Sequence, residues 1–253
     1  MKEVVFPYMN HDSKKNWLKL NKNKKPYIKK ICDISKFSAW LVDGEYIRKN
    51  ICEDFVNYDE HYHLKFIPEK EFWIEKQAVP GEEDYYIDHL LIENRMMASG
   101  AAYKKAYKTA SIIQKRERNK SKLMKELKKE RNNKKELLDK IHKKLLKIKY
   151  KKLKIWIING EIVRDLFDAD FASGGHDFVY HFVPKNEIWI DDDISQKERK
   201  FILLHELHER RLMKKGKTYR EAHRSATEIE DACRHNPRTT GRKIIEEIRK
   251  QNK

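Results

Sequence analysis

Alternating and helix-periodic stretches of hydrophobic residues follow one another twice along this chain. In the second half, short apolar runs cover 154–158 and 188–190, and stretches with helical periodicity cover 196–214 and 218–233. A hydrophobic period of two residues predicts strands, and a period near 3.6 predicts amphipathic helices. Strands followed by helices within one segment predict an α+β fold class.

The same order of segments recurs at a constant offset of 116 positions. The run 40–48 (WLVDGEYIR) aligns with 156–164 (WIINGEIVR), 66–75 aligns with 182–191, and 89–113 aligns with 205–229, with no gap. Such self-similarity at a fixed period is the signature of a repeated structural unit. We interpret it as a tandem duplication, with module 1 over 36–116 and module 2 over 153–235.

Turn and capping residues predict how each module is built. The dipeptides Asp43-Gly44 and Asn159-Gly160 are favoured in two-residue hairpin turns, and a second turn is expected at 184–186. Gly216 is a candidate helix C-cap, and Thr218 with a glutamate three positions later forms a candidate capping box. Each module is therefore predicted to contain two β-hairpins followed by two helices.

Positive charge is concentrated outside the two modules. The formal net charge is +17, and residues 115–154 alone carry 19 basic and 5 acidic side chains. We expect a basic N-terminal arm over 1–35, a long basic helix over 117–152 that joins the modules, and a basic C-terminal helix and tail over 236–253. Because no apolar run is long enough for a membrane span or a signal peptide, we expect no membrane partner and a cytoplasmic or virion-associated protein that is not secreted.

The basic connector is a candidate contact for a polyanion (DNA or RNA) or for an acidic protein surface. Lysine and arginine neutralise phosphates and release counterions, and the connector lacks the interleaved aromatic residues that stack on single strands. A lysine-rich helix that is simply solvated fits the same pattern. The candidate contact residues are Lys125, Lys128, Lys129, Arg131, Lys134, Lys135, Lys143, Lys144 and Lys147.

Module 2 contains residues that suit a metal ion. His205 and Glu209 are four positions apart, so a helix places them on one face. His223 and Glu230 are seven apart on the following helix and share a side there. We predict that these four side chains converge as ligands, with Zn²⁺ as the cofactor that suits a set of nitrogen and carboxylate donors. Glu206 and His208 are the candidate catalytic residues, as general base or outer partner.

At these residues the segment 203–209 (LLHELHE) resembles the zincin metallopeptidases, whose motif is His-Glu-x-x-His. The resemblance implies His205 as a ligand, Glu206 as the catalytic base and Glu209 as a substituted ligand, so the motif is degenerate. It implies a metal-dependent, hydrolase- or peptidase-like activity. The module is also similar to uncharacterised domains of phage and mobile-element proteins.

Module 1 keeps only part of this set. It has His89 and Glu93 at the equivalent positions, but Leu90, Tyr107 and Gln114 replace Glu206, His223 and Glu230. Two interpretations fit: module 2 is a metal site and module 1 a degenerate scaffold, or both His–Glu pairs belong to a structural polar network. The shared polar residues that such a network would include are Arg95 and Arg211, Tyr103 and Tyr219, and Glu71 and Glu187.

Two smaller features are open to a functional interpretation. The segment Gly174–Asp177 can bring His176 over the helix pair, but a variable loop fits it better. The run Asp191–Asp193 suits a hard cation, but a charged turn before a helix is the simpler interpretation. Beside the metal-site hypothesis, the sequence leaves two other functions open: a structural or virion-assembly protein, and a non-specific nucleic-acid-binding protein.

Overall fold

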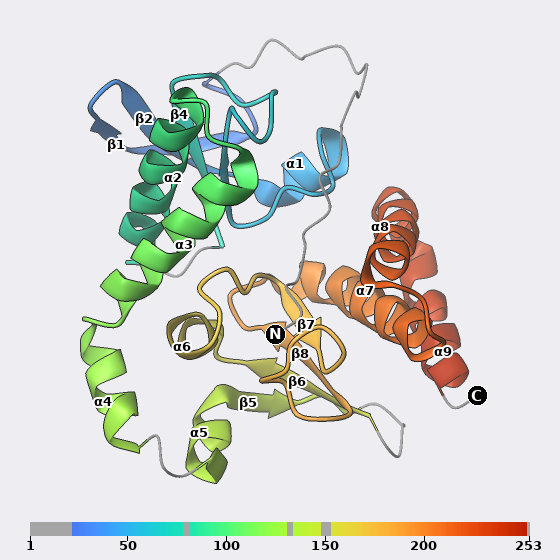
Figure 1. Ribbon diagram of the computed structural model, residues 1–253. Coiled ribbons are helices and arrows are strands. Elements are labelled where there is room, and N and C mark those ends of the chain that lie inside the picture. Colours follow the sequence, from blue (N-terminus) through green and yellow to red (C-terminus); the bar gives the residue numbers. More distant parts are fainter. Residues whose placement is uncertain (1–21, 78–80, 131–133, 148–152, 252–253) are drawn as a thin grey trace. The chain divides into compact units, whose positions relative to one another are not determined.

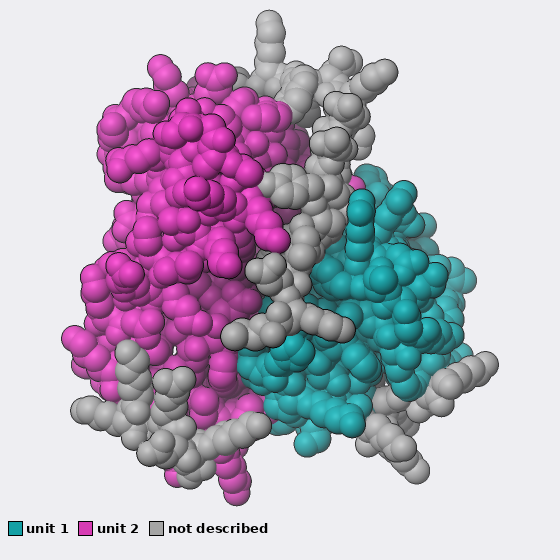
Figure 2. All heavy atoms as spheres, viewed as in Figure 1, with its two compact units in different colours: residues 1–19, 144–158, 173–253 teal, residues 20–143, 159–172 magenta. Residues whose placement is uncertain are grey.

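The computed structural model describes residues 22–77, 81–130, 134–147 and 153–251 (Figure 1). The chain divides into two compact units (Figure 2). Unit 1 includes Lys144–Ile158 and Ser173–Lys253, and unit 2 includes Leu20–Lys143 and Asn159–Ala172. The predicted α+β class is confirmed, because each unit combines helices with sheet strands.

The sheet of unit 2 contains four strands in the order β1-β2-β4-β3. Strand β1 (Tyr27–Ile34) pairs antiparallel with β2 (Phe37–Val42), and β2 pairs parallel with β4 (Glu71–Glu75). Strand β3 (Tyr58–Glu60) closes the other edge and pairs antiparallel with β4. Strand β4 is therefore central, and all five of its residues are buried.

The second sheet repeats this order, as β5-β6-β8-β7. Strand β6 (Lys154–Ile158) pairs parallel with β8 (Glu187–Asp191), and β7 (Gly174–His176) pairs antiparallel with β8. Strand β5 (His142–Leu145) forms the opposite edge. The register also repeats, because Trp156 lies opposite Trp189 as Trp40 lies opposite Trp73.

The first predicted hairpin of each module is wrong. Gly44 and Gly160 begin helices, α1 (Gly44–Asn50) and α6 (Gly160–Leu166), instead of closing a turn. Asp43 and Asn159 are the N-caps, and each side-chain oxygen accepts a hydrogen bond from the backbone amide three residues on. An Asx-Gly pair suits both a hairpin turn and a helix start. The helical crossover then returns the chain for a parallel strand pair, which a hairpin cannot do.

The second predicted strand pair of each module is antiparallel as expected, but its first strand is shorter and lies earlier. In module 2 this strand is β7, which ends well before the turn expected at 184–186, and residues 177–179 form a turn directly after it. The amides of Val179 and Tyr180 both donate to the carbonyl of His176, which turns the chain away from the sheet directly after that residue.

The single long connector helix expected over 117–152 is also wrong. Helix α3 (Tyr103–Arg118) ends there, α4 covers Lys122–Glu130, α5 covers Lys134–Ile141, and strand β5 follows. The break after α3 has a local cause, because the Ser121 hydroxyl accepts a hydrogen bond from the Met124 amide and so caps α4. The Asn132-Asn133 pair, whose low helix propensity predicts a weak point in the middle of this segment, lies outside the described residues.

The two faces of the unit 2 sheet are covered by different helices. Ile47 of α1 packs with Trp73 on one face, and the following helix packs with Phe72 and Ile74 on the other. Helix α2 (Glu83–Ala98) packs against α3 and against strands β3 and β4. Glu82, just before α2, lies in a buried ionic cluster, where it accepts hydrogen bonds from Arg118 at the end of α3 and from Arg164 on α6. Asp165 also accepts from Arg118. This cluster ties α6 into unit 2.

The helices of unit 1 agree closely with the sequence. Helix α7 covers Gln196–Lys214, α8 covers Tyr219–His235, and the predicted C-terminal helix is α9, Thr240–Gln251. Gly216 has the positive φ of a helix C-cap, +87°, and the capping box of Thr218 with Glu221 is present. Helix α7 packs against α8, α9 and strands β7 and β8, so it lies at the centre of the unit (Figure 1).

Candidate metal centre

Helix α7 carries the first two candidate ligands, His205 and Glu209, one turn apart. Nε2 of His205 lies 3.6 Å from Oε2 of Glu209. Only 11% of the His205 side chain and 4% of the Glu209 side chain are exposed. The beginning of α7 is set by Ser195, whose hydroxyl accepts a hydrogen bond from the amide of Glu198. The predicted sharing of one helix face by these two residues is therefore confirmed.

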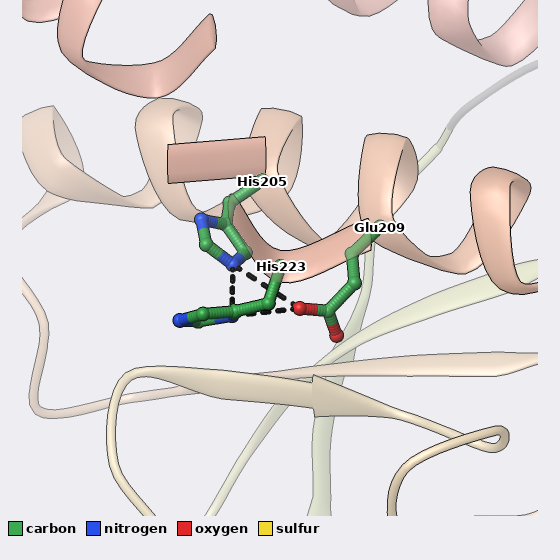
Figure 3. Close-up of side chains that lie close together, drawn as sticks. All are labelled: His205, Glu209 and His223. Carbon is green, nitrogen blue, oxygen red and sulfur yellow. Dashed lines mark hydrogen bonds and ion pairs between the residues drawn. The ribbon is translucent and has the colours of Figure 1, made fainter. Parts of the chain in front are cut away.

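His223 on α8 completes a group of three (Figure 3). Its Nδ1 lies 3.1 Å from Nε2 of His205 and 2.7 Å from Oε2 of Glu209. One ligand atom from each residue lies within 4.8 Å of the others. The His223 side chain is 27% exposed, so the group is open to solvent on that side. The ring of Tyr219 stacks on His223, with centroids 5.3 Å apart, and holds its orientation.

Glu230, the fourth predicted ligand, contacts the other ring nitrogen of His205. Nδ1 of His205 donates to Oε2 of Glu230 over 2.8 Å, which leaves Nε2 of the same ring for the group of three. Arg234 holds Glu230 through two hydrogen bonds and also binds both oxygens of Glu198. Glu230 is therefore placed to orient the His205 ring from outside the group of three, as carboxylates do behind histidine ligands, and not to be a fourth ligand.

The electrostatics of the group are set by its buried charges. Burial lowers the pKa of His205, but hydrogen bonds to Glu209 and Glu230 outweigh it and hold that pKa well above its usual value. Burial opposes ionisation of Glu209, yet hydrogen bonds from His176, His205 and His223 lower its pKa strongly. A positive charge between two carboxylates is thus favoured where the three side chains meet. A divalent cation satisfies the same field.

Glu206, the predicted catalytic base, is buried beside this group. Its carboxylate forms a second close group with Glu209 and His176. Burial and the neighbouring Glu209 carboxylate raise the pKa of Glu206 to about 8. A carboxyl group with such a pKa can exchange a proton near neutral pH.

His208, the other predicted catalytic residue, belongs to a different contact set. Its Nε2 lies 3.0 Å from the hydroxyl of Ser225, and its Nδ1 lies 3.2 Å from Oε1 of Glu247 on α9. Arg211 binds the same Glu247 carboxylate. His208 therefore joins α7 to α8 and α9 and does not share the cluster around His205.

His176 was set aside in the sequence in favour of a variable loop, and this interpretation is wrong. The residue ends strand β7, is fully buried, and places Nε2 3.0 Å from Oε1 of Glu209. The preceding Gly174-Gly175 pair was the available signal. A Cβ on Gly174 would lie 2.9 Å from a side-chain carbon of Ile202 and 3.0 Å from the backbone oxygen of Trp189. Glycine thus allows β7 to approach α7 closely.

The three side chains fit a zinc ion in type and spacing. Two imidazoles and a carboxylate are ligands that catalytic zinc sites use. Ligand atoms about 2.0–2.1 Å from a tetrahedral ion lie about 3.3 Å from one another, and the three separations here are 2.7, 3.1 and 3.6 Å. With three protein ligands, a fourth position remains for water or substrate.

The equivalent residues in unit 2 repeat part of this arrangement. Nε2 of His89 lies 3.7 Å from Oε2 of Glu93, and Nδ1 of His89 lies 2.8 Å from Oε1 of Gln114. Tyr107 takes the place of His223, and its ring lies 5.4 Å from the His89 ring. Within the described residues, this part of the chain contains no group of three side chains able to hold a metal.

A buried His–Glu–Arg chain does form, from His205 through Glu230 to Arg234. Of the shared polar residues, Tyr219 joins the group by stacking on His223, while Arg211, Glu187 and Glu71 bind elsewhere. Arg211 binds Glu247, and Glu187 accepts from the indole of Trp189, as Glu71 does from Trp73. Asp191–Asp193 do form a third close acidic group. There the Asp193 amide donates to Oδ1 of Asp191, as expected for the charged turn before α7.

The candidate nucleic-acid residues are spread over several elements and both compact units. Of the described side chains, those of Lys125 on α4, Lys135 on α5, Lys143 and Lys144 on β5, and Lys147 are exposed. Lys128 and Lys129 belong to α4 and Lys134 begins α5, while Arg131 lies outside the described residues. The described candidates therefore do not share the face of a single helix.

Comparison with family models, curated proteins and solved structures finds no match to this chain. Among the described residues, no helix combines the length and the apolar character needed to cross a membrane.

Proposed function

We propose that the chain is a zincin-like metalloenzyme of the hydrolase type, with its centre on α7 and α8. The observation that carries this proposal is the convergence of His205 Nε2, Glu209 Oε2 and His223 Nδ1 within 4.8 Å of one another. Two imidazoles and one carboxylate form one of the ligand sets of catalytic zinc sites, which also keep a position open to water or substrate.

The departure from the His-Glu-x-x-His motif has a structural counterpart. Glu209 stands where the motif has its second histidine, and His223 supplies the second imidazole from the next helix. The donor set is thus two histidines and a glutamate, as in known zinc hydrolase sites. The order of the ligands along the chain differs from the motif, while the kind of donor set is preserved.

The roles of the protein groups follow from their positions. Zn²⁺ bound at such a site supplies Lewis acidity and lowers the pKa of a bound water. Glu206, with its pKa raised to about 8, holds or accepts a proton beside the ligand group. Glu230 orients the His205 ring through Nδ1, and Arg234 keeps Glu230 in place.

We infer further that the two halves arose by tandem duplication and that the first has lost the site. The shared strand order, the matching tryptophan register and the 116-position sequence repeat support this. A phage or mobile-element setting, within a virion or another assembly, remains a proposal from resemblance alone. Nucleic-acid binding remains a prediction from charge.

Elemental analysis of the purified protein after mild zinc loading and desalting tests the proposal. We expect about one zinc per chain, and none in His205→Ala. The matched control is His89→Ala, which changes the equivalent histidine of unit 2 and should leave the zinc content unchanged. A fully folded wild-type protein without zinc would overturn the proposal.

Catalysis is tested separately from metal binding. In Glu206→Gln the three ligands are intact, so we expect one zinc per chain but at least about a hundredfold lower hydrolysis of a mixed peptide library, since general acid–base groups contribute about 10²–10⁴-fold. Equal hydrolysis by the variant and the wild type would remove Glu206 from the mechanism.

A further inference from the structure

The contacts of His176 define which of its two ring nitrogens carries a proton. The backbone N–H of Phe178, two residues on, donates a hydrogen bond to Nδ1 of His176 over 3.2 Å. An imidazole nitrogen that accepts a hydrogen bond has its lone pair in the ring plane and no hydrogen. In the neutral ring the hydrogen is therefore on Nε2, which faces Oε1 of Glu209 at 3.0 Å.

Because of this hydrogen bond, the two carboxylate oxygens of Glu209 have different partners. Oε1 accepts from His176, while Oε2 faces His223 at 2.7 Å and His205 at 3.6 Å. With one oxygen engaged, the carboxylate presents the other to the ligand group. Outer hydrogen bonds of this kind fix the orientation of a metal ligand.

A two-metal centre is the competing arrangement, because His176, Glu206 and Glu209 also form a close group. Two groups that share Glu209 could hold two metal ions, with its carboxylate as the bridge. For His176 to ligate through Nε2, the proton on that atom would have to leave or move to Nδ1. Nδ1 cannot take it, because it faces the hydrogen of the Phe178 amide.

We propose that His176 is a positioning residue for Glu209 and that the centre holds a single metal ion. This rests on the proposed function, since it concerns the same ligand group. The rigidity needed for the role comes from the fold: strand β7 is held on β8, and Gly174 allows it to pack directly on α7. The ring is fully buried, so water does not compete for either nitrogen.

Three variants separate positioning from ligation and from simple packing. His176→Leu fills the space without a donor, and His176→Gln restores an N–H near the position of Nε2. His181→Leu, at an exposed site in the following loop, is the matched control. Each protein is assayed for metal content by elemental analysis, for zinc affinity by chelator competition, and for the ligand-field absorption of bound Co²⁺. Thermal unfolding shows that each variant is folded.

We expect one metal per chain in the wild type and in all three variants. Zinc affinity should fall about 10–100-fold in His176→Leu, the range measured for outer partners of metal ligands. His176→Gln should recover most of the affinity and the Co²⁺ spectrum, and His181→Leu should match the wild type. The ¹⁵N NMR spectrum of the metal-free protein should show the His176 ring protonated on Nε2.

Several results would overturn the inference, and they are distinguishable. Two metals per chain in the wild type and one in His176→Leu would make His176 a ligand of a two-metal centre. Unchanged affinity and spectrum in a folded His176→Leu protein would leave it only a packing role, while the proposed function would stand. A wild-type protein that binds no metal would overturn both.

Discussion

The clusters around His89 and His205 share a frame but differ in charge. In both, a histidine on the first helix of a pair approaches a glutamate four residues on, at 3.7 Å and 3.6 Å. In both, Nδ1 of that histidine lies 2.8 Å from a side-chain oxygen on the second helix. The helix pair can therefore hold this geometry with or without a complete ligand set. Three further side chains distinguish the candidate metal centre: His176, Glu206 and His223 stand where the first half has Glu60, Leu90 and Tyr107.

The buried glutamates show what those side chains do. Burial, together with the Asp59 and Glu60 carboxylates, raises the pKa of Glu93 to about 9. Around Glu209, three histidines outweigh burial and lower the pKa. A neutral carboxyl is thus expected at neutral pH in one cluster and a carboxylate in the other. Only the carboxylate is ready to bind a cation.

The largest difference between the clusters should appear in metal binding. We expect Glu209→Gln to weaken zinc affinity by more than the approximately hundredfold upper range found for outer partners, because a direct ligand is lost. Glu93→Gln, at the equivalent position, should leave the affinity unchanged. Isothermal titration with Zn²⁺ measures both. A similar loss in the two variants would mean that the clusters do not differ in this way.

The second largest effect is expected in the free energy of unfolding, at the buried ion pairs that join α2 to α3 and α7 to α8. Glu82 accepts hydrogen bonds from two buried arginines, Arg118 and Arg164. Glu198 accepts hydrogen bonds from Arg234, and this arginine also binds Glu230, a contact that would remain without Glu198. Removing one partner of a buried pair costs about 3–5 kcal/mol.

We therefore expect Glu82→Ala to lose about that much unfolding free energy, and Glu198→Ala to lose less. Urea unfolding followed by circular dichroism gives both values. Equal losses would show that the bonds of Arg234 to Glu230 do not offset the loss of Glu198.

A pH-dependent effect of intermediate size is expected at Glu93. Its folded pKa, about 9, lies above the ordinary value of 4.5. The folded state therefore binds the additional proton between these values, and stability falls as pH rises through this window. Glu93→Gln should remove this slope and be more stable than the wild type by about 2–4 kcal/mol at pH 8, with little difference near pH 4.

In the metal-free protein, Glu209→Gln should be less stable than the wild type at neutral pH, and this difference should shrink in acid. The depressed pKa of Glu209 stabilises the fold above its ordinary pKa, and this is lost in acid. Unfolding free energies measured from pH 2 to 8 test the pair of variants, because the effect of Glu209 falls below its ordinary pKa of 4.5 and that of Glu93 above it. Parallel pH profiles would contradict the assigned difference in charge.

The smallest effect is expected at Gly174. A Cβ there would meet a Trp189 backbone oxygen at 3.0 Å, so Gly174→Ala should cost about 1–3 kcal/mol through overpacking. Gly241, on α9, is the matched control, because an added Cβ there would meet no described atom within 4 Å beyond its own stretch of helix. Gly241→Ala should be neutral or stabilise by about 0.5–1 kcal/mol. Thermal unfolding distinguishes the two outcomes.

Local sequence signals predicted the helices of unit 1 and the meeting of His205 with Glu209 and His223. Periodicity, Gly216 and the Thr218–Glu221 box define α7 and α8 within a short stretch, so neighbouring helices bring these three side chains together. The sequence could not predict that Glu230 contacts Nδ1 of His205 instead of lying among the three candidate ligands. Spacing predicts that two residues share a helix face, but not which ring nitrogen of a histidine they contact.

The remaining errors came from choices that depend on distant residues. Asp43 and Asn159 could cap a helix or form a turn, and only the parallel pairing of β2 with β4 and of β6 with β8 decides between them. His176 lies 33 positions from Glu209, and its approach depends on strand pairing as well as on Gly174. Neither spacing nor composition reports such contacts.

The closeness of the ligand residues along the chain bears on the order of folding. His205 and His223 are separated by only 18 positions, so the loop that their contact closes has a small entropic cost. Contacts of short range also form quickly. We expect the helical hairpin α7–α8 to assemble its ligand group early, and the edge strand with His176 to dock onto it later. Metal captured by the hairpin would then act as a nucleus for the folding of unit 1.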